Sequence, residues 1–135
     1  MTDEPVFLTV GEVLALHIDQ IREFGGSEGI RDEGGLESAV AQASSTFDGK
    51  YLHASLFEMA AAYAFHIAEN HPFVDGNKRT ALNSAIVFLG LNGFDVVEEE
   101  GRLYEAMIGL TTGGSSKGQM AALLEQLSKP WRDDD

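Results

Sequence analysis

Apolar residues recur at helical spacing over much of this chain, and the first such stretch covers residues 13–24. Thr9 and Glu12 precede it in the pattern of a capping box, and a glycine pair follows it. Residues 27–35 combine glycines with charges, which is typical of a loop. A shorter and weaker helical pattern then covers residues 36–43.

The most apolar stretch lies in the middle of the chain, at residues 56–70, and has no polar face. Ser55 and Glu58 form a second capping-box pattern at its start. Because a helix that is apolar all round must be buried, we expect this one at the centre of the fold. Helical spacing returns over residues 81–91, after a polar loop, and an Asn-Gly pair ends it.

The segment 44–54 breaks the helical pattern. Asp48-Gly49 at its middle is a hairpin-type turn, with apolar or aromatic residues on both sides. The pattern is compatible with a small β-hairpin flap and equally with a plain surface loop.

The C-terminal part of the chain is less regular. Residues 94–97 predict a short extended link, and residues 99–110 predict a polar-flanked helix. A third capping-box pattern begins at Ser116 and opens a last helix that reaches Ser128. Residues 129–135 are interpreted as a short acidic tail. Together the segments predict a compact all-α domain of about six helices that spans residues 1–135.

The formal net charge of −13 argues against direct nucleic-acid binding and against binding to an anionic membrane, since both require a positive surface. The absence of cysteine excludes disulfides and thiolate chemistry and fits a cytoplasmic protein. The sequence contains no apolar run of the ~20 residues that a transmembrane helix needs, and its acidic N-terminus is unlike a signal peptide.

Against this acidic background, the loop before the helix at 81–91 stands out because it concentrates chemically useful groups. His71 offers an imidazole that can accept a proton from a hydroxyl near neutral pH. Asp75 is a hard oxygen ligand of the kind that Mg²⁺ uses together with substrate phosphates.

The second half of the same loop is suited to an anion. Gly76 allows a sharp backbone turn, and Asn77 can hold that turn or contact a phosphate oxygen. Lys78 and Arg79 are two of only nine cations in the chain, and they stand where the helix dipole disfavours positive charge. Taken singly, these residues have ordinary explanations as caps, turns or solvated charges. Their joint occurrence indicates phosphoryl or nucleotidyl transfer.

The nine residues His71-Pro72-Phe73-Val74-Asp75-Gly76-Asn77-Lys78-Arg79 resemble the motif of the Fic/Doc family, and the Asn-Lys-Arg ending resembles its death-on-curing (Doc) toxin branch. Residues 29–39 and 80–93 are similar to the segments that flank this motif. The resemblance implies an all-helical Fic fold, ATP and Mg²⁺ as cofactors, and transfer to a protein hydroxyl. It implies a base at His71, a metal-binding acid at Asp75, a core anchor at Phe73, and an anion cradle at Gly76, Asn77 and Arg79. Lys78 adds a further cation to this cradle.

Two positions depart from family members that transfer AMP, which usually have glycine at Lys78 and a second arginine at Leu82. Both departures fit the Doc branch, whose members resemble kinases that move the γ-phosphate of ATP to a threonine of elongation factor Tu and arrest translation. The resemblance further implies a Phd-like antitoxin as partner in a type II toxin–antitoxin system. It also places a target-docking flap at Phe47–Leu52.

Other interpretations stay open at this level. An AMP transferase on the same fold, a catalytically idle Fic-fold binding module and a metal-dependent phosphohydrolase each explain part of the loop. The remaining histidines, at positions 17, 53 and 66, lack the spacing of a zinc site. We interpret His17 and His66 as packed or surface residues, whereas His53 lies near the expected flap.

Overall fold

The computed structural model describes residues 4–97 and 101–131. This part of the chain forms six helices and four short strands, so the expected all-α class of about six helices is confirmed. In chain order the elements are α1 (Val10–Phe24), α2 (Glu33–Gln42), β1 (Thr46–Phe47), β2 (Lys50–Tyr51), α3 (Leu56–Asn70), α4 (Asn77–Leu91), β3 (Phe94–Val96), α5 (Arg102–Thr112), α6 (Lys117–Leu127) and β4 (Ser128–Pro130). Within the described residues, every helix is too short or too polar to cross a membrane.

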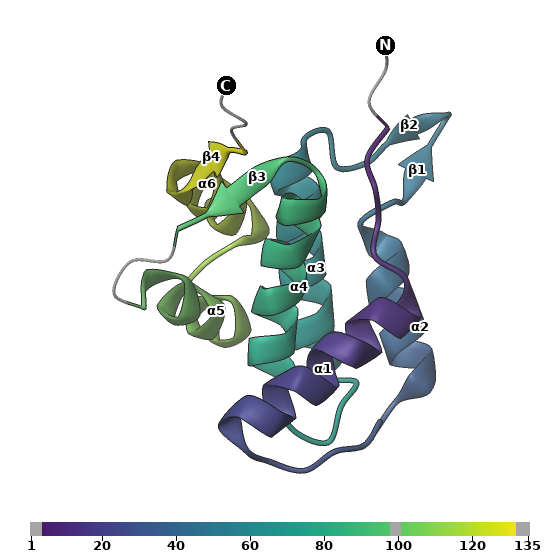
Figure 1. Cartoon of the computed structure of the whole chain (residues 1–135). Coiled ribbons are helices and arrows are strands. Elements are labelled where there is room, and N and C mark those ends of the chain that lie inside the picture. The colour runs from purple at the N-terminus through teal and green to yellow at the C-terminus, as the bar shows by residue number, and fades with distance from the viewer. Residues whose placement is uncertain (1–3, 98–100, 132–135) are drawn as a thin grey trace.

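Helix α3 lies at the centre of the fold, as its uniformly apolar sequence predicts. It packs against α2, α4, α5 and α6, and its residues 59–64 are all buried. Four of these six residues are alanines, whose small side chains let neighbouring helices approach closely. Figure 1 shows α3 and α4 side by side, with α1 and α2 on one flank and α5 and α6 on the other.

Side-chain caps begin three of the six helices in the described residues at the predicted places. The capping boxes at Thr9 and at Ser116 are complete, with both reciprocal hydrogen bonds present. The box at Ser55 is only half formed and so corrects the prediction: Ser55 accepts from Glu58 N, but the Glu58 carboxylate accepts from Ala54 N rather than from Ser55 N.

Helix α2 corrects a second boundary, because it begins at Glu33 rather than at Leu36. Asp32 is the N-cap and its carboxylate accepts from Gly35 N at 2.9 Å. This cap satisfies a backbone donor of the first turn and stabilises helix across the two glycines that had suggested a loop.

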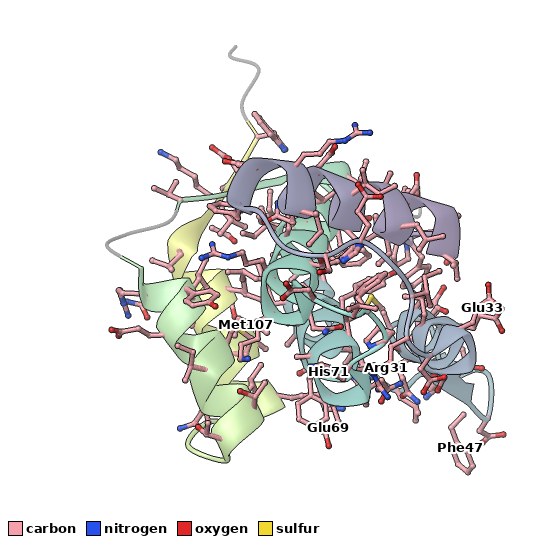
Figure 2. The ribbon with its side chains drawn as sticks, turned by 90° about the horizontal axis from the view of Figure 1, so that it is seen from below. Arg31, Glu33, Phe47, Glu69, His71 and Met107 are labelled. Atoms are coloured by element: carbon pink, nitrogen blue, oxygen red, sulfur yellow. The ribbon has the colours of Figure 1, made fainter. Side chains whose placement is uncertain are left out.

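The ambiguous segment around Asp48-Gly49 is a β-hairpin. Thr46 pairs with Tyr51 and Phe47 with Lys50, which leaves a two-residue turn in which both φ angles are positive. Phe47 is 75% exposed and projects from this hairpin in Figure 2.

The C-terminal segment differs from the expected tail. Residues 128–130 form β4, which pairs antiparallel with β3, and Trp131 N donates to Gly93 O at 2.8 Å. Residues 132–135 lie outside the described part, as does the predicted helix start at Glu99. The described part of that helix, α5, begins at Arg102 and runs two residues beyond the predicted end, to Thr112.

Candidate active site

Residues 71–76 join the C-terminus of α3 to the N-terminus of α4 and form the loop at the lower end of these helices in Figure 1. The sequence predicts a loop between two helices at this place but begins the second helix at residue 81, whereas α4 begins at Asn77, so that Lys78 and Arg79 belong to its first turn. We call residues 71–79 the catalytic loop. His71 is the C-cap of α3 and has left-handed backbone angles, φ 51° and ψ 54°. A non-glycine residue adopts this conformation at a cost of about 1–2 kcal/mol, so other contacts must hold it.

Those contacts come from residues 29–32, which run beside the loop. The Arg31 guanidinium donates from Nε to His71 O at 2.7 Å and from Nη2 to Asn70 O at 3.0 Å. Figure 2 shows Arg31 and His71 next to each other. A cation at the C-terminus of α3 satisfies two carbonyl groups of the last turn and complements the negative end of the helix dipole.

Backbone hydrogen bonds join the same two segments. Arg31 N and Asp32 N both donate to Pro72 O, at 2.6 and 3.0 Å, and Val74 N donates to Gly29 O at 3.1 Å. These three backbone hydrogen bonds fix the first half of the catalytic loop against residues 29–32, as a neighbouring strand fixes an edge strand.

Asn77 holds the loop from within. Its carboxamide accepts from Phe73 N and donates to Phe73 O, each at 2.9 Å, and its side chain is buried. Of the two roles considered for Asn77, the structure therefore places its side chain in the first, that of fixing the turn. Phe73 is fully buried beneath it, as expected for a core anchor.

Helix α1 forms the floor under the loop. The buried His17 ring stacks on the Phe73 ring with centroids 3.8 Å apart and an interplanar angle of 6°, and His17 Nε2 lies 2.8 Å from Asp75 O. Gly76 has a φ of 76°, and a Cβ atom there would lie 3.1 Å from Ile21 Cδ1. The backbone conformation and the close approach of α1 together favour glycine at this position.

The Asp75 carboxylate is oriented by two backbone amides. Oδ1 accepts from Gly76 N at 2.9 Å and Oδ2 accepts from Ser27 N at 3.3 Å. An ionised carboxylate offers about four lone-pair positions, so these two bonds leave room for a further ligand. Among the described residues, His, Asp and Glu do not form a group of three that could hold a metal alone. Asp75 therefore fits Mg²⁺ in the mode that takes one or two carboxylates and completes its shell with phosphate oxygens and water.

The N-terminus of α4 is open. Its N-cap is Gly76, and within the described chain no side chain accepts from its first N–H groups. The first turn of α4 has no acidic residue and instead carries Lys78 and Arg79. The Arg79 guanidinium lies 4.0 Å from the centre of the Phe24 ring and 5.0 Å from that of Tyr104, which positions this cation between α1 and α5.

These groups meet around one cavity of about 270 Å³. All six residues that the sequence singled out contribute to its wall, namely His71, Asp75, Gly76, Asn77, Lys78 and Arg79. A second cavity of about 280 Å³ adjoins it and shares Phe24, Arg79 and Tyr104. Leu82, which stands where AMP-transferring relatives usually have arginine, lines this second cavity.

The hairpin lies away from this site. It precedes the N-terminus of α3, whereas His71 follows the C-terminus, and a 15-residue helix is about 22 Å long. Figure 1 shows the hairpin at the end of α3 remote from the catalytic loop. In this conformation Phe47–Leu52 forms a hairpin, but one that is not next to His71.

The side chains of two further residues, Arg31 and His17, hydrogen-bond to the catalytic loop and were not singled out by the sequence. Arg31 stands in a charged glycine-rich stretch that reads as an ordinary loop, so its spacing carries no signal. His17 lies four residues after Val13 and four before Ile21, and all three are buried on α1. A histidine within an apolar stripe is a detectable signal, although it does not reveal what the imidazole contacts.

Comparison with known proteins places the chain in a family. Residues 7–89 match the model of the Fic/DOC family. The chain is 36% identical over 116 residues to "Protein kinase doc" of Escherichia phage P1, and the aligned segment covers 86% of this chain and 90% of that protein. It is 42% identical over 76 residues to "Toxin Doc" of Mycolicibacterium smegmatis, and the aligned segment covers 56% of this chain and 58% of that protein. The chain belongs to the Fic/DOC family.

Proposed function

We propose that this protein is the toxin of a type II toxin–antitoxin system and acts as a protein Ser/Thr kinase. It moves the γ-phosphate of ATP to a threonine of elongation factor Tu, and a Phd-like antitoxin restrains it. The observation that carries the proposal is the shared cavity, in which His71, Asp75, Lys78 and Arg79 surround an open helix N-terminus. The similarity to a relative named a protein kinase supports the choice of reaction.

Each residue has a role in this reaction. His71 accepts the proton of the target hydroxyl as its oxygen attacks the γ-phosphorus and ADP leaves. The N–H groups at the start of α4, with Lys78 and Arg79, stabilise the charge on the transferring group. Asp75 would hold Mg²⁺ together with ATP, and the ion would supply positive charge that stabilises the phosphates during transfer.

Leu82 supports transfer of the terminal phosphate rather than of AMP. An apolar side chain at the boundary of the second cavity cannot bind further phosphates beyond those that Arg79 and Lys78 contact. The cations of the cradle are then confined to Lys78 and Arg79, and we assign the γ-phosphate to them.

The test is incubation of the protein with ATP, Mg²⁺ and elongation factor Tu, followed by mass spectrometry of the intact target. We expect a gain of about 80 Da for one phosphate; a gain of about 329 Da would identify AMP transfer and reject the kinase. His71→Ala should lower the transfer rate by about 100- to 10,000-fold, the usual contribution of a general base. Asp75→Asn should abolish transfer at the same protein concentration.

A matched control separates loss of chemistry from loss of fold. His66 is a histidine of α3 whose Nε2 accepts a hydrogen bond from Lys117 Nζ at 3.1 Å, and it does not line the cavity. His66→Ala should keep the transfer rate. If His71→Ala arrested growth as fully as the unaltered chain, the protein would act as a binding module and not as an enzyme.

A further inference from the structure

His17 is the one histidine of α1, and its imidazole is engaged on two sides by the catalytic loop. It is 3% exposed, stacks in parallel on Phe73, and has its Nε2 atom 2.8 Å from the carbonyl oxygen of Asp75. A carbonyl oxygen only accepts hydrogen bonds, so Nε2 must carry the hydrogen and donate. The contact thus assigns the imidazole proton to Nε2.

The bond acts on a peptide unit that begins the anion cradle. The peptide unit that joins Asp75 to Gly76 makes a hydrogen bond at each end. Its oxygen, Asp75 O, accepts from His17 Nε2, and its nitrogen, Gly76 N, donates to Asp75 Oδ1. Because a peptide unit is planar, these two bonds fix the direction in which the chain enters α4. The same two bonds set where the Asp75 carboxylate and the first N–H groups of α4 point.

Packing alone does not account for an imidazole here. A phenylalanine at position 17 would offer a similar flat ring to Phe73 and would carry no polar atom into a buried place. A buried polar group costs stability unless it is hydrogen-bonded, and its bond here goes to the catalytic loop rather than to another element of the core. The feature that distinguishes histidine at this position is its N–H group.

We propose that His17 is a positioning residue of the catalytic loop: its Nε2–H group holds the Asp75 carbonyl and thereby orients the metal-binding acid and the anion cradle. This inference rests on the proposed phosphoryl transfer for its consequence, but its geometry can be tested without any activity. His17 does not line the cavity and so acts through Asp75 and Gly76 rather than on the substrate.

Two substitutions separate the ring from its hydrogen bond. His17→Phe keeps the stack on Phe73 and removes the donor, whereas His17→Gln removes the ring and keeps an N–H group at a similar reach. We expect His17→Phe to lower kcat/KM for ATP about 10- to 100-fold, with the KM for the protein target unchanged. His17→Gln should recover a substantial part of that loss. His66→Phe, which removes an imidazole on another face of the molecule, should change neither constant.

A spectroscopic readout makes the test independent of turnover. In ¹H–¹⁵N spectra of the unaltered chain, the His17 imidazole should carry its proton on Nε2, and His17→Phe should shift the Gly76 and Asn77 amide signals. The proposal is overturned if His17 is protonated only on Nδ1, if His17→Phe leaves these amide signals and kcat/KM for ATP unchanged, or if His17→Gln is as impaired as His17→Phe. If the unaltered chain transfers no phosphate while the spectra are as expected, the kinase proposal fails and the positioning of the loop by His17 stands.

Discussion

The N-termini of α1 and α4 are built in opposite ways. At α1, the Thr9 hydroxyl accepts from Glu12 N and the Glu12 carboxylate accepts from Thr9 N, so the helix end is closed by its own side chains. At α4, Gly76 offers no side chain, and the first turn carries two cations where the helix dipole is positive. The first arrangement satisfies the N–H groups of Thr9 and Glu12 and stabilises the fold. The second has no side-chain cap bond and leaves the N–H groups of the first turn of α4 available to a ligand.

The two helix ends also differ in what surrounds them. Leu8, just before α1, is buried and its N–H donates to the Tyr63 hydroxyl of α3 at 2.8 Å, which joins this helix end to the core. The corresponding contacts at α4 come from Asp75, His17 and Asn77, and they orient the loop without covering the first N–H groups. Rigidity at the site therefore comes from the loop, because the helix end itself must stay open.

The largest effect is expected from a side chain placed at the open end of α4. Gly76→Ala should lower the transfer rate about 100-fold, because a Cβ atom 3.1 Å from Ile21 Cδ1 requires Ile21 or the loop to shift, and the φ of 76° strains the loop backbone. The left-handed φ of 76° adds a loss of about 1–2 kcal/mol in unfolding free energy. Transfer kinetics and urea denaturation measure the two effects separately.

Gly113→Ala is the matched control for this variant. Gly113 ends α5 with a φ of 86° in the same left-handed region, and a Cβ atom there would meet no atom within 4 Å. The control should lose similar stability and keep its transfer rate. Equal loss of activity in both variants would show that Gly76 acts only through stability.

A second experiment tests the contact that joins the closed end to the core. Burial raises the pKa of Tyr63 from 10.0 to about 12. The folded chain therefore favours the protonated phenol of Tyr63 over the phenolate. The unfolding free energy is unaffected by the ionisation of this group below pH 10 and falls as the pH rises from 10 to about 12. Two pKa units correspond to about 3 kcal/mol at most.

Tyr63→Phe removes this titration. Urea denaturation between about pH 9 and about pH 12 should show a shallower loss of stability in the variant than in the unaltered chain. At neutral pH the variant should be about 1–2 kcal/mol less stable, because Leu8 N loses its acceptor. An identical pH slope in both chains would contradict the role assigned to Tyr63.

The smallest expected effect comes from opening the closed end. Thr9→Ala removes the capping hydroxyl and should lower the unfolding free energy by about 1 kcal/mol, with the transfer rate per folded molecule unchanged. Thr111→Ala serves as control, since its exposed hydroxyl donates to Ile108 O near the end of α5 and should matter by less than about 0.5 kcal/mol. A change in transfer rate for Thr9→Ala would mean that the two helix ends are not functionally distinct.

Much of the fold follows from local signals. Local signals predict several helix boundaries because they act on the backbone within a few residues. Examples are the capping boxes at Thr9 and Ser116, the apolar stretch at residues 56–70 and the Asn-Gly pair after residue 91. At the C-terminal strand a partner from elsewhere in the chain decides the outcome, whereas at the start of α2 a local cap does. Residues 128–130 carry no strand pattern of their own and become a strand because β3 lies beside them. The start of α2 was missed because the Asp32 cap outweighs the two glycines that follow.

The sequence by itself determined the inventory of the candidate site. Six residues within nine positions were close in space because they are close in the chain, and their arrangement at a helix N-terminus follows from the helical period after residue 80. Only the tertiary structure decided how that loop is held. Arg31, His17 and the floor formed by Ile21 come from segments 40 to 58 positions away along the chain, and no spacing rule connects them to His71 or Asp75. Their contacts depend on how α1 and residues 29–32 pack against the ends of α3 and α4, which is a property of the folded chain.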